Sequence, residues 1–285
     1  MKDVTNAMRA HILTAAVPYI KQYTDQYVVV KYGGNAMIDE ELKKSVMKDL
    51  MLLQLVGVKV VLVHGGGPAI NSTLDAMKIE SRFANGLRVT DEATMDVVQM
   101  VLAGKVNKGL VADLTDLGGK AIGLCGVDGN MIQVHKQNDE LGYVGSIDTI
   151  DTSIIDDVIS RGYIPVISSI GMGADGKTYN INADTVAAKI AGALKAETMV
   201  AMTNIDGVLR DVHDPSSLIS KITMAEADQL KAEGIIAGGM IPKVDCCLEA
   251  IKSGAQKVFI INGEIPHAIL IELLTDEGLG TMFVK

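Results

Sequence analysis

Several large classes of protein are excluded by what this sequence lacks. It has three cysteines, Cys125, Cys246 and Cys247, none with CxxC spacing, so no zinc-binding pattern is present and we expect no metal site. No segment reaches the ~18 unbroken apolar residues that a membrane-spanning helix needs. No basic cluster is present and the formal net charge is −9, whereas a nucleic-acid-binding protein usually has a basic face. We therefore expect neither nucleic acid nor a membrane among its partners.

The cysteine count and the N-terminal residues indicate the cellular location of the protein. The odd number of cysteines, two of them adjacent, indicates reduced thiols. Asp3, Arg9 and Lys21 interrupt any apolar run near the N-terminus, so the sequence does not begin like a signal peptide. These features predict a cytoplasmic protein. The negative net charge repels acidic metabolites, so a site for an anionic substrate has to be built locally from a few cations and backbone N–H groups.

Short apolar runs alternate with amphipathic runs along the whole chain. Because 48% of the residues are hydrophobic, the chain can bury a large core. Several apolar runs are continuous, which is typical of strands that helices cover on both faces of a parallel sheet. The sequence therefore predicts an α/β fold, a three-layer α/β/α sandwich with a mostly parallel central sheet. The expected strands are 28–31, 58–63, 163–168, 199–202 and 257–261.

Helix ends and turns indicate how these strands are connected. A helix over 39–56 is predicted by its apolar face, with Asp39 as its N-cap and Gly57 as its stop. Asn85-Gly86 and Asp175-Gly176 are typical of hairpin turns. A helix that ends before a new strand near 194–197 suggests a boundary. We expect an N-terminal segment over 1–26, one lobe over 27–195 and a second lobe over 196–285.

Two glycine-rich motifs resemble well-known sites that this sequence does not support. Residues 171–178, GMGADGKT, match both the P-loop pattern and the dinucleotide-binding pattern, yet both need a helix that opens directly at the motif. Residues 179–183 intervene here, so neither a P-loop nor a dinucleotide-binding site is favoured. The HGGG at 64–67 resembles the oxyanion loop of esterases, but no serine lies in a GxSxG elbow.

A lysine and two glycine loops follow successive predicted strands. Lys31 precedes Gly33-Gly34, and Gly65-Gly66-Gly67 follows the next strand. In open α/β folds, ligands bind at the carboxyl ends of the strands, where glycines let a backbone N–H approach a phosphate. Lys31 is equally compatible with a strand-end lysine that reaches for water, and each loop with an ordinary tight turn. Two such loops together favour an anion cradle.

Four more polar residues are candidates for the same site. Lys243 is expected in the first turn of a helix opened by Pro242, where a cation opposes the helix dipole unless it has a function. Asp184 suits an N-cap, and its second carboxylate oxygen is free to orient a lysine. Arg88 offers a planar fork for a carboxylate, and Asn180 lies in an extended segment. Taken alone, each of these four residues is equally compatible with an ordinary exposed or capping residue that has no function in a site.

The motifs together resemble the amino-acid kinase family, and within it the N-acetylglutamate kinases, over nearly the whole chain. One departure is Asn204, where relatives often carry Asp, which concerns a detail of the nucleotide site. The motifs that carry the resemblance are KYGG at 31–34, HGGGP at 64–68, NGLRVT at 85–90, YNINAD at 179–184, DGVL at 206–209 and GGMIPK at 238–243.

The resemblance implies the reaction and a role for each candidate residue. ATP, carrying Mg²⁺, would phosphorylate the side-chain carboxylate of N-acetyl-L-glutamate, the second step of arginine biosynthesis. Lys31 and Lys243 would stabilise the transferring phosphoryl group, and Asp184 would hold both lysines. Backbone N–H groups for the phosphoryl group would come from Gly33, Gly34 and Gly66. The substrate would be bound by Gly66, Gly67, Arg88 and Asn180, and the nucleotide by Thr203, Asp206, Gly207, Val208, Gly239, Met240 and Lys243.

This reading agrees with the chemistry of phosphoryl transfer, which needs positioning and charge neutralisation more than covalent help. A carboxylate is already a nucleophile, so no general base is required. Three alternatives remain open. One is another family member that acts on carbamate, aspartate, glutamate or UMP, the second is a nucleotide sensor without catalysis, and the third is an oxidoreductase that uses the glycines at 171–176.

The residues before the first strand predict a further element. Met8, Ile12, Ala16 and Ile20 recur at helical spacing, and Pro18 should kink or break this helix. A helix that folds back on its own subunit and one that pairs with another subunit are both compatible with this pattern. The resemblance favours the second, because N-acetylglutamate kinases that L-arginine inhibits carry such a helix, which joins three dimers into a hexamer. It implies feedback inhibition by L-arginine, bound near Tyr19, Glu277 and Gly280.

Overall fold

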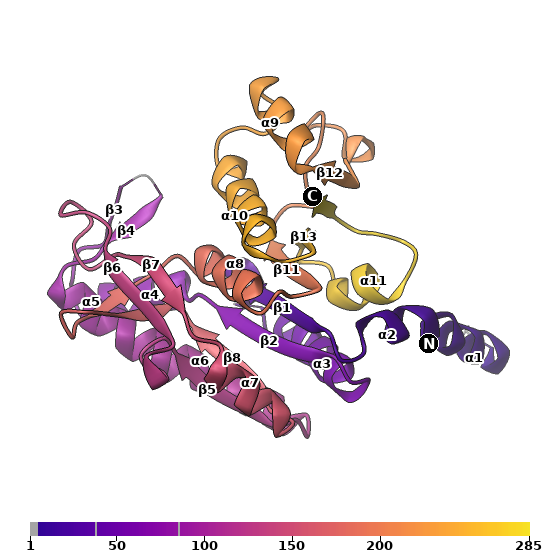
Figure 1. Cartoon of the computed structure of the whole chain (residues 1–285), viewed down its shortest axis with the longest axis horizontal. Coiled ribbons are helices and arrows are strands. Elements are labelled where there is room, and N and C mark those ends of the chain that lie inside the picture. Colours follow the sequence, from indigo (N-terminus) through magenta and orange to yellow (C-terminus); the bar gives the residue numbers. More distant parts are fainter. Residues whose placement is uncertain (1–4, 38, 85) are drawn as a thin grey trace.

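A mostly parallel sheet runs through the middle of the molecule in the computed structural model, which describes residues 5–37, 39–84 and 86–285 (Figure 1). Six strands are parallel, from β13 to β5, while β14 is antiparallel to β13 and pairs with β12 at the edge. The strand order within the described residues is β12 (Lys221–Thr223), β14 (Thr281–Val284), β13 (Lys257–Asn262), β11 (Thr198–Thr203), β1 (Tyr27–Tyr32), β2 (Lys59–His64), β8 (Ile164–Ser168) and β5 (Ala121–Cys125).

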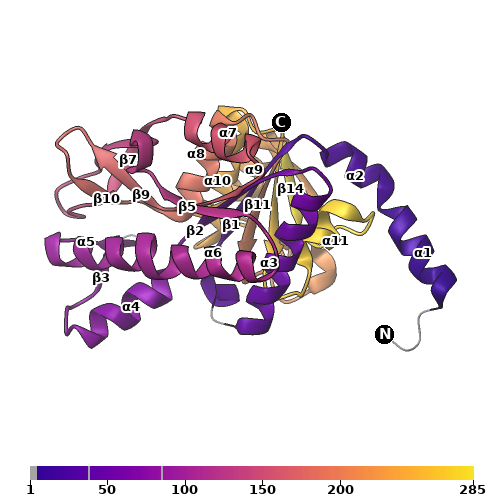
Figure 2. The same cartoon turned by 90° about the horizontal axis from the view of Figure 1, so that it is seen from below.

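Helices cover both faces of this sheet, which confirms the predicted three-layer α/β/α fold (Figures 1 and 2). Because side chains alternate along a strand, Val28 and Val30 of β1 join one apolar cluster and Val29 joins the other. The first cluster includes residues of α3 (Glu40–Leu55), α6 (Asn107–Asp116) and α11 (Ala268–Leu274). The second includes residues of α7 (Ser153–Ser160), α8 (Ala183–Ala193), α9 (Met224–Ala232) and α10 (Met240–Ser253).

A smaller four-stranded sheet lies beside the main one. Its order is β10 (Thr178–Asn180), β9 (Ile170–Gly173), β6 (Ile132–Lys136) and β7 (Gly145–Ile150). The antiparallel β9–β10 pair confirms the hairpin predicted at Asp175-Gly176. Strand β10 stands where a P-loop needs a helix, so the structure agrees with the exclusion of that motif. A second hairpin joins β3 (Arg82–Ala84) and β4 (Leu87–Val89), as predicted, although Asn85 of its turn lies outside the described residues.

The helices that border the glycine loops form a nearly continuous rod (Figure 2). Helix α5 (Glu92–Gln99) runs into a π-helical segment, η2 (Met100–Val106), and then into α6. Helix α4 (Gly67–Ala76) starts directly at the second glycine loop. Short 3₁₀ turns, within the described part, are η1 (Gly34–Met37), η3 (Asp128–Asn130) and η4 (Pro215–Ser217).

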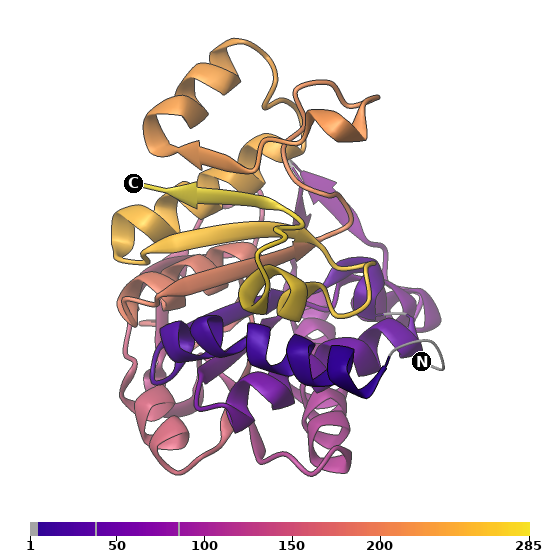
Figure 3. The ribbon, with the colours of Figure 1, turned by 90° about the vertical axis from the view of Figure 1, so that its right-hand side faces the viewer.

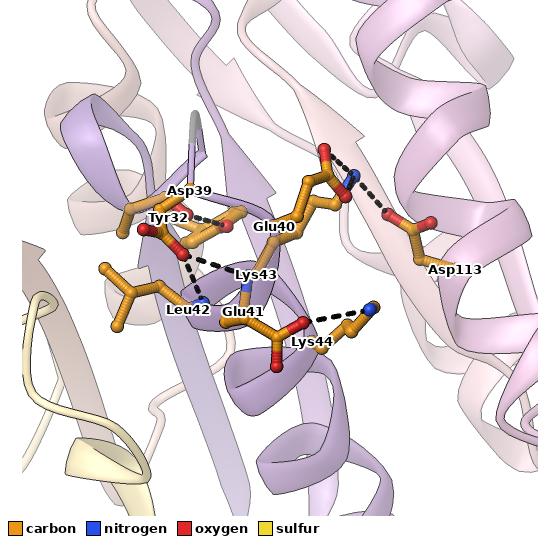
Figure 4. A network of polar contacts seen from close by, with 9 residues as sticks. Tyr32, Asp39, Glu40, Glu41, Leu42, Lys43, Lys44 and Asp113 are labelled. Atoms are coloured by element: carbon orange, nitrogen blue, oxygen red, sulfur yellow. Dashed lines mark hydrogen bonds and ion pairs between the residues drawn. The ribbon is translucent and has the colours of Figure 1, made fainter.

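Helix α3 begins where its capping residue was predicted. The Asp39 carboxylate accepts hydrogen bonds from the N–H groups of Glu41 and Leu42, both at 2.9 Å. Figure 4 shows this cap and the ion pairs beside it. Lys43 pairs with Glu40 at 2.9 Å within α3 and with Asp113 of α6 at 3.2 Å, so the first turn of α3 is tied to its neighbour.

Two helix starts differ from the sequence-based expectation. Asn182, not Asp184, caps α8, because its side-chain oxygen accepts from the N–H groups of Asp184 and Thr185 at 2.8 and 3.3 Å. Asp184 therefore lies inside the first turn, and its carboxylate is not used as the cap. Helix α10 begins at Met240, with Gly239 as its N-cap, so Pro242 is its third residue and not its first.

The N-terminal segment forms two short helices, α1 (Asn6–Ala15) and α2 (Val17–Tyr23), with the break beside Pro18 as predicted. Helix α2 packs on the molecule beside α11, and Tyr19 and Ile20 touch the adjacent core (Figure 3). Helix α1 extends away and buries none of its residues: Met8, Ile12 and Leu13 are 53%, 57% and 73% exposed. Residues 1–4 lie outside the described chain.

The two predicted lobes share the central sheet. Strands β1, β2, β5 and β8 come from residues 27–195, and β11 to β14 come from residues 196–285, so the two groups meet at the β1–β11 pair. The division into lobes at this pair stays a prediction. Within the part of the chain that the structure describes, no helix is long and apolar enough to cross a membrane.

Candidate active site

A cavity of about 320 Å³ opens at the carboxyl ends of β1, β2 and β8. It brings together most of the residues that the sequence predicts for the substrate and the phosphoryl group, although they come from four separate segments of the chain. These residues are Lys31, Gly33, Gly34, Gly66, Gly67, Arg88, Asn180 and Asp184.

Lys31 and Asp184 form an ion pair in the wall of this cavity. Lys31 stands two residues after Val29, so strand alternation points it to the face that α8 covers. Its Nζ lies 3.0 Å from Oδ1 of Asp184, with the side chains 11% and 22% exposed. Because Asn182 caps α8, the Asp184 carboxylate is available to orient the lysine. The pair holds a cation at the point where an anion would enter.

The two glycine loops line the cavity with backbone. Gly34 adopts a φ of +72°, a conformation that side chains disfavour. Gly66 is restricted differently: a Cβ there would lie 2.6 Å from Cδ2 of Leu102, so only glycine fits against this buried side chain. Gly66 and Gly67 begin α4, and the first N–H groups of a helix have no partner within it. These groups are donors for an anionic ligand.

Arg88 is held in place before any ligand arrives. Its guanidinium lies 4.7 Å from the centre of the Phe83 ring, donates to Oδ1 of Asn71 at 2.6 Å and donates to Oγ of Ser81. Burial lowers the pKa of Arg88, yet a guanidinium stays charged in proteins. The described residues accept from two of its five N–H donors, which leaves others for a carboxylate. Neither Asn71 nor Ser81 could be predicted as a partner of Arg88, because neither belongs to a motif.

Asn180 lies at the end of β10 and lines the cavity with Arg88. Its side chain donates to Oγ1 of Thr90 at 3.3 Å, and Thr90 donates to the carbonyl of Arg88 at 2.8 Å. Thr90 is fully buried and links the two predicted substrate residues. No role could be assigned to Thr90 from the sequence, since Asn180, one of its two partners, lies 90 residues further along the chain.

Lys243 lines an adjoining cavity of about 570 Å³ at the N-terminus of α10. Asn182 and Asp184 form part of the wall of both cavities, so the two spaces are neighbours. Among the described contacts, Asp184 pairs with Lys31, and its predicted hold on Lys243 stays a prediction. Gly239 lines this second cavity as well, at the start of the helix that Met240 opens.

The remaining residues predicted for the nucleotide lie at the end of β11, away from the walls of these two cavities. Asp206 accepts a hydrogen bond from Asn262 at 2.8 Å, which joins the ends of β11 and β13. Val208 is 1% exposed, and its N–H donates to Thr281 at 2.8 Å. Thr203 bonds the carbonyl of Ile205 at 3.0 Å. Together with Gly207 they shape a loop at the same edge of the sheet as the lysines.

The arrangement favours chemistry on anions. Two lysines, a guanidinium and two glycine loops line two cavities that have Asp184 in both of their walls. Such a set neutralises charge that develops on a transferring phosphoryl group and positions its acceptor.

Known proteins are similar in sequence to this chain over nearly its whole length. The amino acid kinase family model matches residues 26–262. The acetylglutamate kinase of Brachyspira hyodysenteriae is 52% identical over 287 residues, which covers 100% of this chain and 100% of that protein. The acetylglutamate kinase of Clostridium beijerinckii is 52% identical over 277 residues, which covers 96% of this chain and 97% of that one.

Solved structures share the fold. N-acetylglutamate synthase from Neisseria gonorrhoeae, complexed with coenzyme A and N-acetyl-glutamate, is 27% identical with a TM-score of 0.84. The match covers 97% of this chain and 63% of the synthase, so this chain spans less than two thirds of the synthase. Carbamate kinase from Giardia lamblia bound to AMP-PNP has a TM-score of 0.65 at 17% identity, covers 91% of this chain and 98% of its own, and shows the fold alone.

Proposed function

This chain belongs to the amino acid kinase family, and we propose that it transfers the γ-phosphoryl group of ATP to the side-chain carboxylate of N-acetyl-L-glutamate. It is a phosphotransferase, as the curated acetylglutamate kinases that are about half identical over the full chain indicate. The product is N-acetyl-L-glutamyl 5-phosphate, and the reaction belongs to arginine biosynthesis. The three cysteines of the chain are unpaired, in keeping with a cytoplasmic location.

One observation carries the assignment of the reacting groups: the Lys31–Asp184 pair, the glycine loops and Arg88 surround a single cavity. Arg88 would hold the α-carboxylate of the substrate, with Asn180 beside it. The side-chain carboxylate would then face Lys31 and the N–H groups of Gly66 and Gly67. This placement separates the two carboxylates, so one is clamped while the other reacts.

The reaction needs no proton transfer at the acceptor. An oxygen of the side-chain carboxylate attacks the γ-phosphorus, and the bond from that phosphorus to the β,γ-bridging oxygen breaks as ADP leaves. Charge on the three transferred oxygens would be stabilised by Lys31 from one side and Lys243 from the other, with the Gly33, Gly34 and Gly66 N–H groups as further donors. Asp184 would orient Lys31, to which it is already bonded.

The nucleotide would occupy the cavity that Lys243 lines and extend toward the loop of Thr203, Asp206, Gly207 and Val208. The cavity walls carry lysines and backbone N–H groups, which suit phosphate oxygens, so Mg²⁺ would enter on the phosphates of ATP. When bound, the ion neutralises phosphate charge. The protein groups around it would position the nucleotide against the acceptor.

We also propose that L-arginine inhibits the enzyme and that it assembles as a hexamer of three dimers. Helix α1 leaves Met8, Ile12 and Leu13 exposed, which suits a surface that another subunit covers. Two of the candidate inhibitor contacts have partners that involve α11: Tyr19 packs against the core cluster that includes residues of α11, and the N–H of Gly280 donates to Glu272 of α11 at 3.1 Å. Glu277 lies in the same loop.

ADP release measures the proposed reaction directly. With Mg²⁺ and ATP, N-acetyl-L-glutamate should accelerate ADP release far more than L-glutamate does, because only the acetylated amine matches the proposed substrate. Aspartate and carbamate serve as further controls. Equal rates with acetylated and free glutamate would overturn the substrate, and no release with any acceptor would favour a nucleotide sensor.

A further inference from the structure

A histidine without a role in the proposed reaction lies directly beneath the second glycine loop. His64 ends β2 and is fully buried. Its Nδ1 lies 2.8 Å from the carbonyl oxygen of Gly65, and its Nε2 lies 3.0 Å from Nδ2 of Asn107 on α6. Both ring nitrogens therefore have partners, and one partner belongs to the loop that lines the active-site cavity.

The partners of Asn107 fix which ring nitrogen carries the hydrogen. Its Nδ2 lies 2.8 Å from the carbonyl of Val166 and 3.3 Å from that of Leu124, and a carbonyl can only accept. These contacts identify Nδ2 as the NH2 end of the amide, which has two hydrogens and cannot accept, so toward His64 it donates one hydrogen and Nε2 accepts. In the neutral ring the hydrogen then sits on Nδ1, which donates to Gly65. Burial lowers the pKa of His64 to about 4, which keeps the ring neutral at physiological pH.

The hydrogen bond to Gly65 determines the direction of the next N–H. The carbonyl of Gly65 and the N–H of Gly66 belong to one peptide plane and point to opposite sides when the peptide is trans. The described residues contain no cis peptide. Since the Gly65 carbonyl faces the buried ring, the Gly66 N–H faces the cavity that both glycines line. Among the described residues, no backbone carbonyl accepts a hydrogen bond from the Gly66 N–H.

Side chains of the π-helical segment pack against this peptide at Gly66. A row of side chains at every fourth position drifts by about 40° per step around an α-helix. A π-helical turn is wider than an α-helical turn, so within Met100–Val106 side chains four positions apart lie closer to one line along the helix. Leu102 and Val106 therefore both face Gly66, and Asn107 is the next residue in the chain. Cδ2 of Leu102 and Cγ2 of Val106 lie 2.6 and 3.3 Å from the position of a Cβ on Gly66. Such π segments often occur at functional sites.

We propose that His64 and Asn107 are positioning residues that lock the Gly65–Gly66 peptide, so that its N–H meets the phosphoryl group being transferred. This inference rests on the proposed phosphotransferase function. A glycine-rich peptide can rotate easily, and rotation would replace the donor with a carbonyl oxygen facing the phosphate. The ring removes that alternative orientation before the substrates bind, because the flipped Gly65 carbonyl would lose its hydrogen bond from His64.

Two variants of His64 separate this role from simple packing. His64→Asn keeps an N–H near the position of Nδ1 and can still donate to Gly65, whereas His64→Gln places its amide near the position of Nε2. We expect kcat of His64→Asn within about fivefold of wild type and kcat of His64→Gln lower by about 10–100-fold, short of the 10²–10³ for complete loss of such a donor. KM for both substrates should change little, because the contact strengthens in the transition state.

Leu114→Ala is the matched control. Leu114 is fully buried on the same helix as Asn107, about 10 Å further along its axis, and it does not line the cavity. This variant should lower the melting temperature and leave kcat of the folded enzyme unchanged. Equal kcat values for His64→Asn and His64→Gln, measured on folded protein, would overturn the proposal.

A spectroscopic readout tests the ring without relying on turnover. In protein labelled with ¹⁵N-histidine, the signal absent from His64→Asn identifies His64 among the five histidines. We expect the neutral Nδ1–H form, unchanged between pH 6 and 8. An Nε2–H form would overturn the positioning alone, whereas wild-type protein without kinase activity would overturn the proposed function.

Discussion

Arg88→Lys tests how the substrate is recognised while leaving the net charge unchanged. Arg88 is buried, lies over the Phe83 ring and donates to Asn71 and Ser81, so these contacts hold its side chain in the wall of the cavity. A lysine has the same charge but no planar fork, and it cannot keep the two protein contacts and hold a carboxylate in bidentate fashion at once.

The size of the effect follows from the bonds that are lost. A hydrogen bond to a charged group contributes about 1.5–3 kcal/mol, and about 1.4 kcal/mol corresponds to a factor of ten. Loss of one of the two bonds to the substrate carboxylate should therefore raise KM for N-acetylglutamate by roughly 10–100-fold. The clamped carboxylate is remote from the reacting one, so kcat should fall by no more than about threefold.

The assay is ADP release over a range of N-acetylglutamate concentrations at saturating ATP. Arg82→Lys is the matched control, since Arg82 lies on the same hairpin, is exposed and does not line the cavity. Its KM should equal that of wild type. If Arg88→Lys is folded and its KM lies within twofold of the control, Arg88 does not clamp the substrate and the orientation proposed here is wrong.

Three further changes have defined outcomes. Lys31→Ala and Lys243→Ala should each lower kcat by roughly 10²–10³, with a higher KM for ATP in the second; near-normal turnover would remove that lysine from the mechanism. The folded pKa of His64, near 4 through burial with a smaller contribution from Lys108, lies below its ordinary value of 6.5, so stability is complete above pH 6.5 and falls as pH drops toward 4. Chemical denaturation should show wild type losing about 3 kcal/mol more than His64→Asn over this range, and parallel curves would contradict a buried neutral ring. Deletion of residues 1–25 should give active dimers that ignore arginine, and a truncated protein that stays hexameric and arginine-sensitive in sizing and activity assays would refute the role of α1.

The main features of the fold could be predicted because local signals agreed with it. The apolar strand before Lys31, the Asp39 cap and the alternation of strand and helix all describe short segments whose structure depends on their own residues. The break beside Pro18 follows from the same kind of rule, since proline lacks the N–H that continues a helix. Signals of this kind placed the glycine loops and Lys31 at one edge of the sheet.

Helix starts were less predictable where two capping residues compete. Asn182 and Asp184 are both good N-caps, and nothing local decides between them. The structure uses Asn182, which leaves Asp184 for Lys31, a partner more than 150 residues away in the chain. The choice between capping and pairing is therefore made by the tertiary fold, which brings β1 against α8.

The supporting shell of the site was not predictable at all. Asn107 reaches His64 across 43 residues, and Asn71 reaches Arg88 across 17, without any motif to mark them. The π-helical segment could not be predicted from the sequence either, because the spacing of its apolar residues fits an α-helix nearly as well. These groups depend on long-range packing, whereas the lysines and glycines are marked by their place after strands.

Trapping of the acyl phosphate is the most direct test of the central claim. With hydroxylamine, Mg²⁺ and ATP present, the enzyme should form a hydroxamate from N-acetyl-L-glutamate, in step with ADP release. L-glutamate and L-aspartate should give little hydroxamate under the same conditions, and carbamate should not increase ADP release. ADP release without hydroxamate would contradict phosphorylation of a carboxylate, and preferential use of any of these controls would contradict N-acetyl-L-glutamate as the substrate.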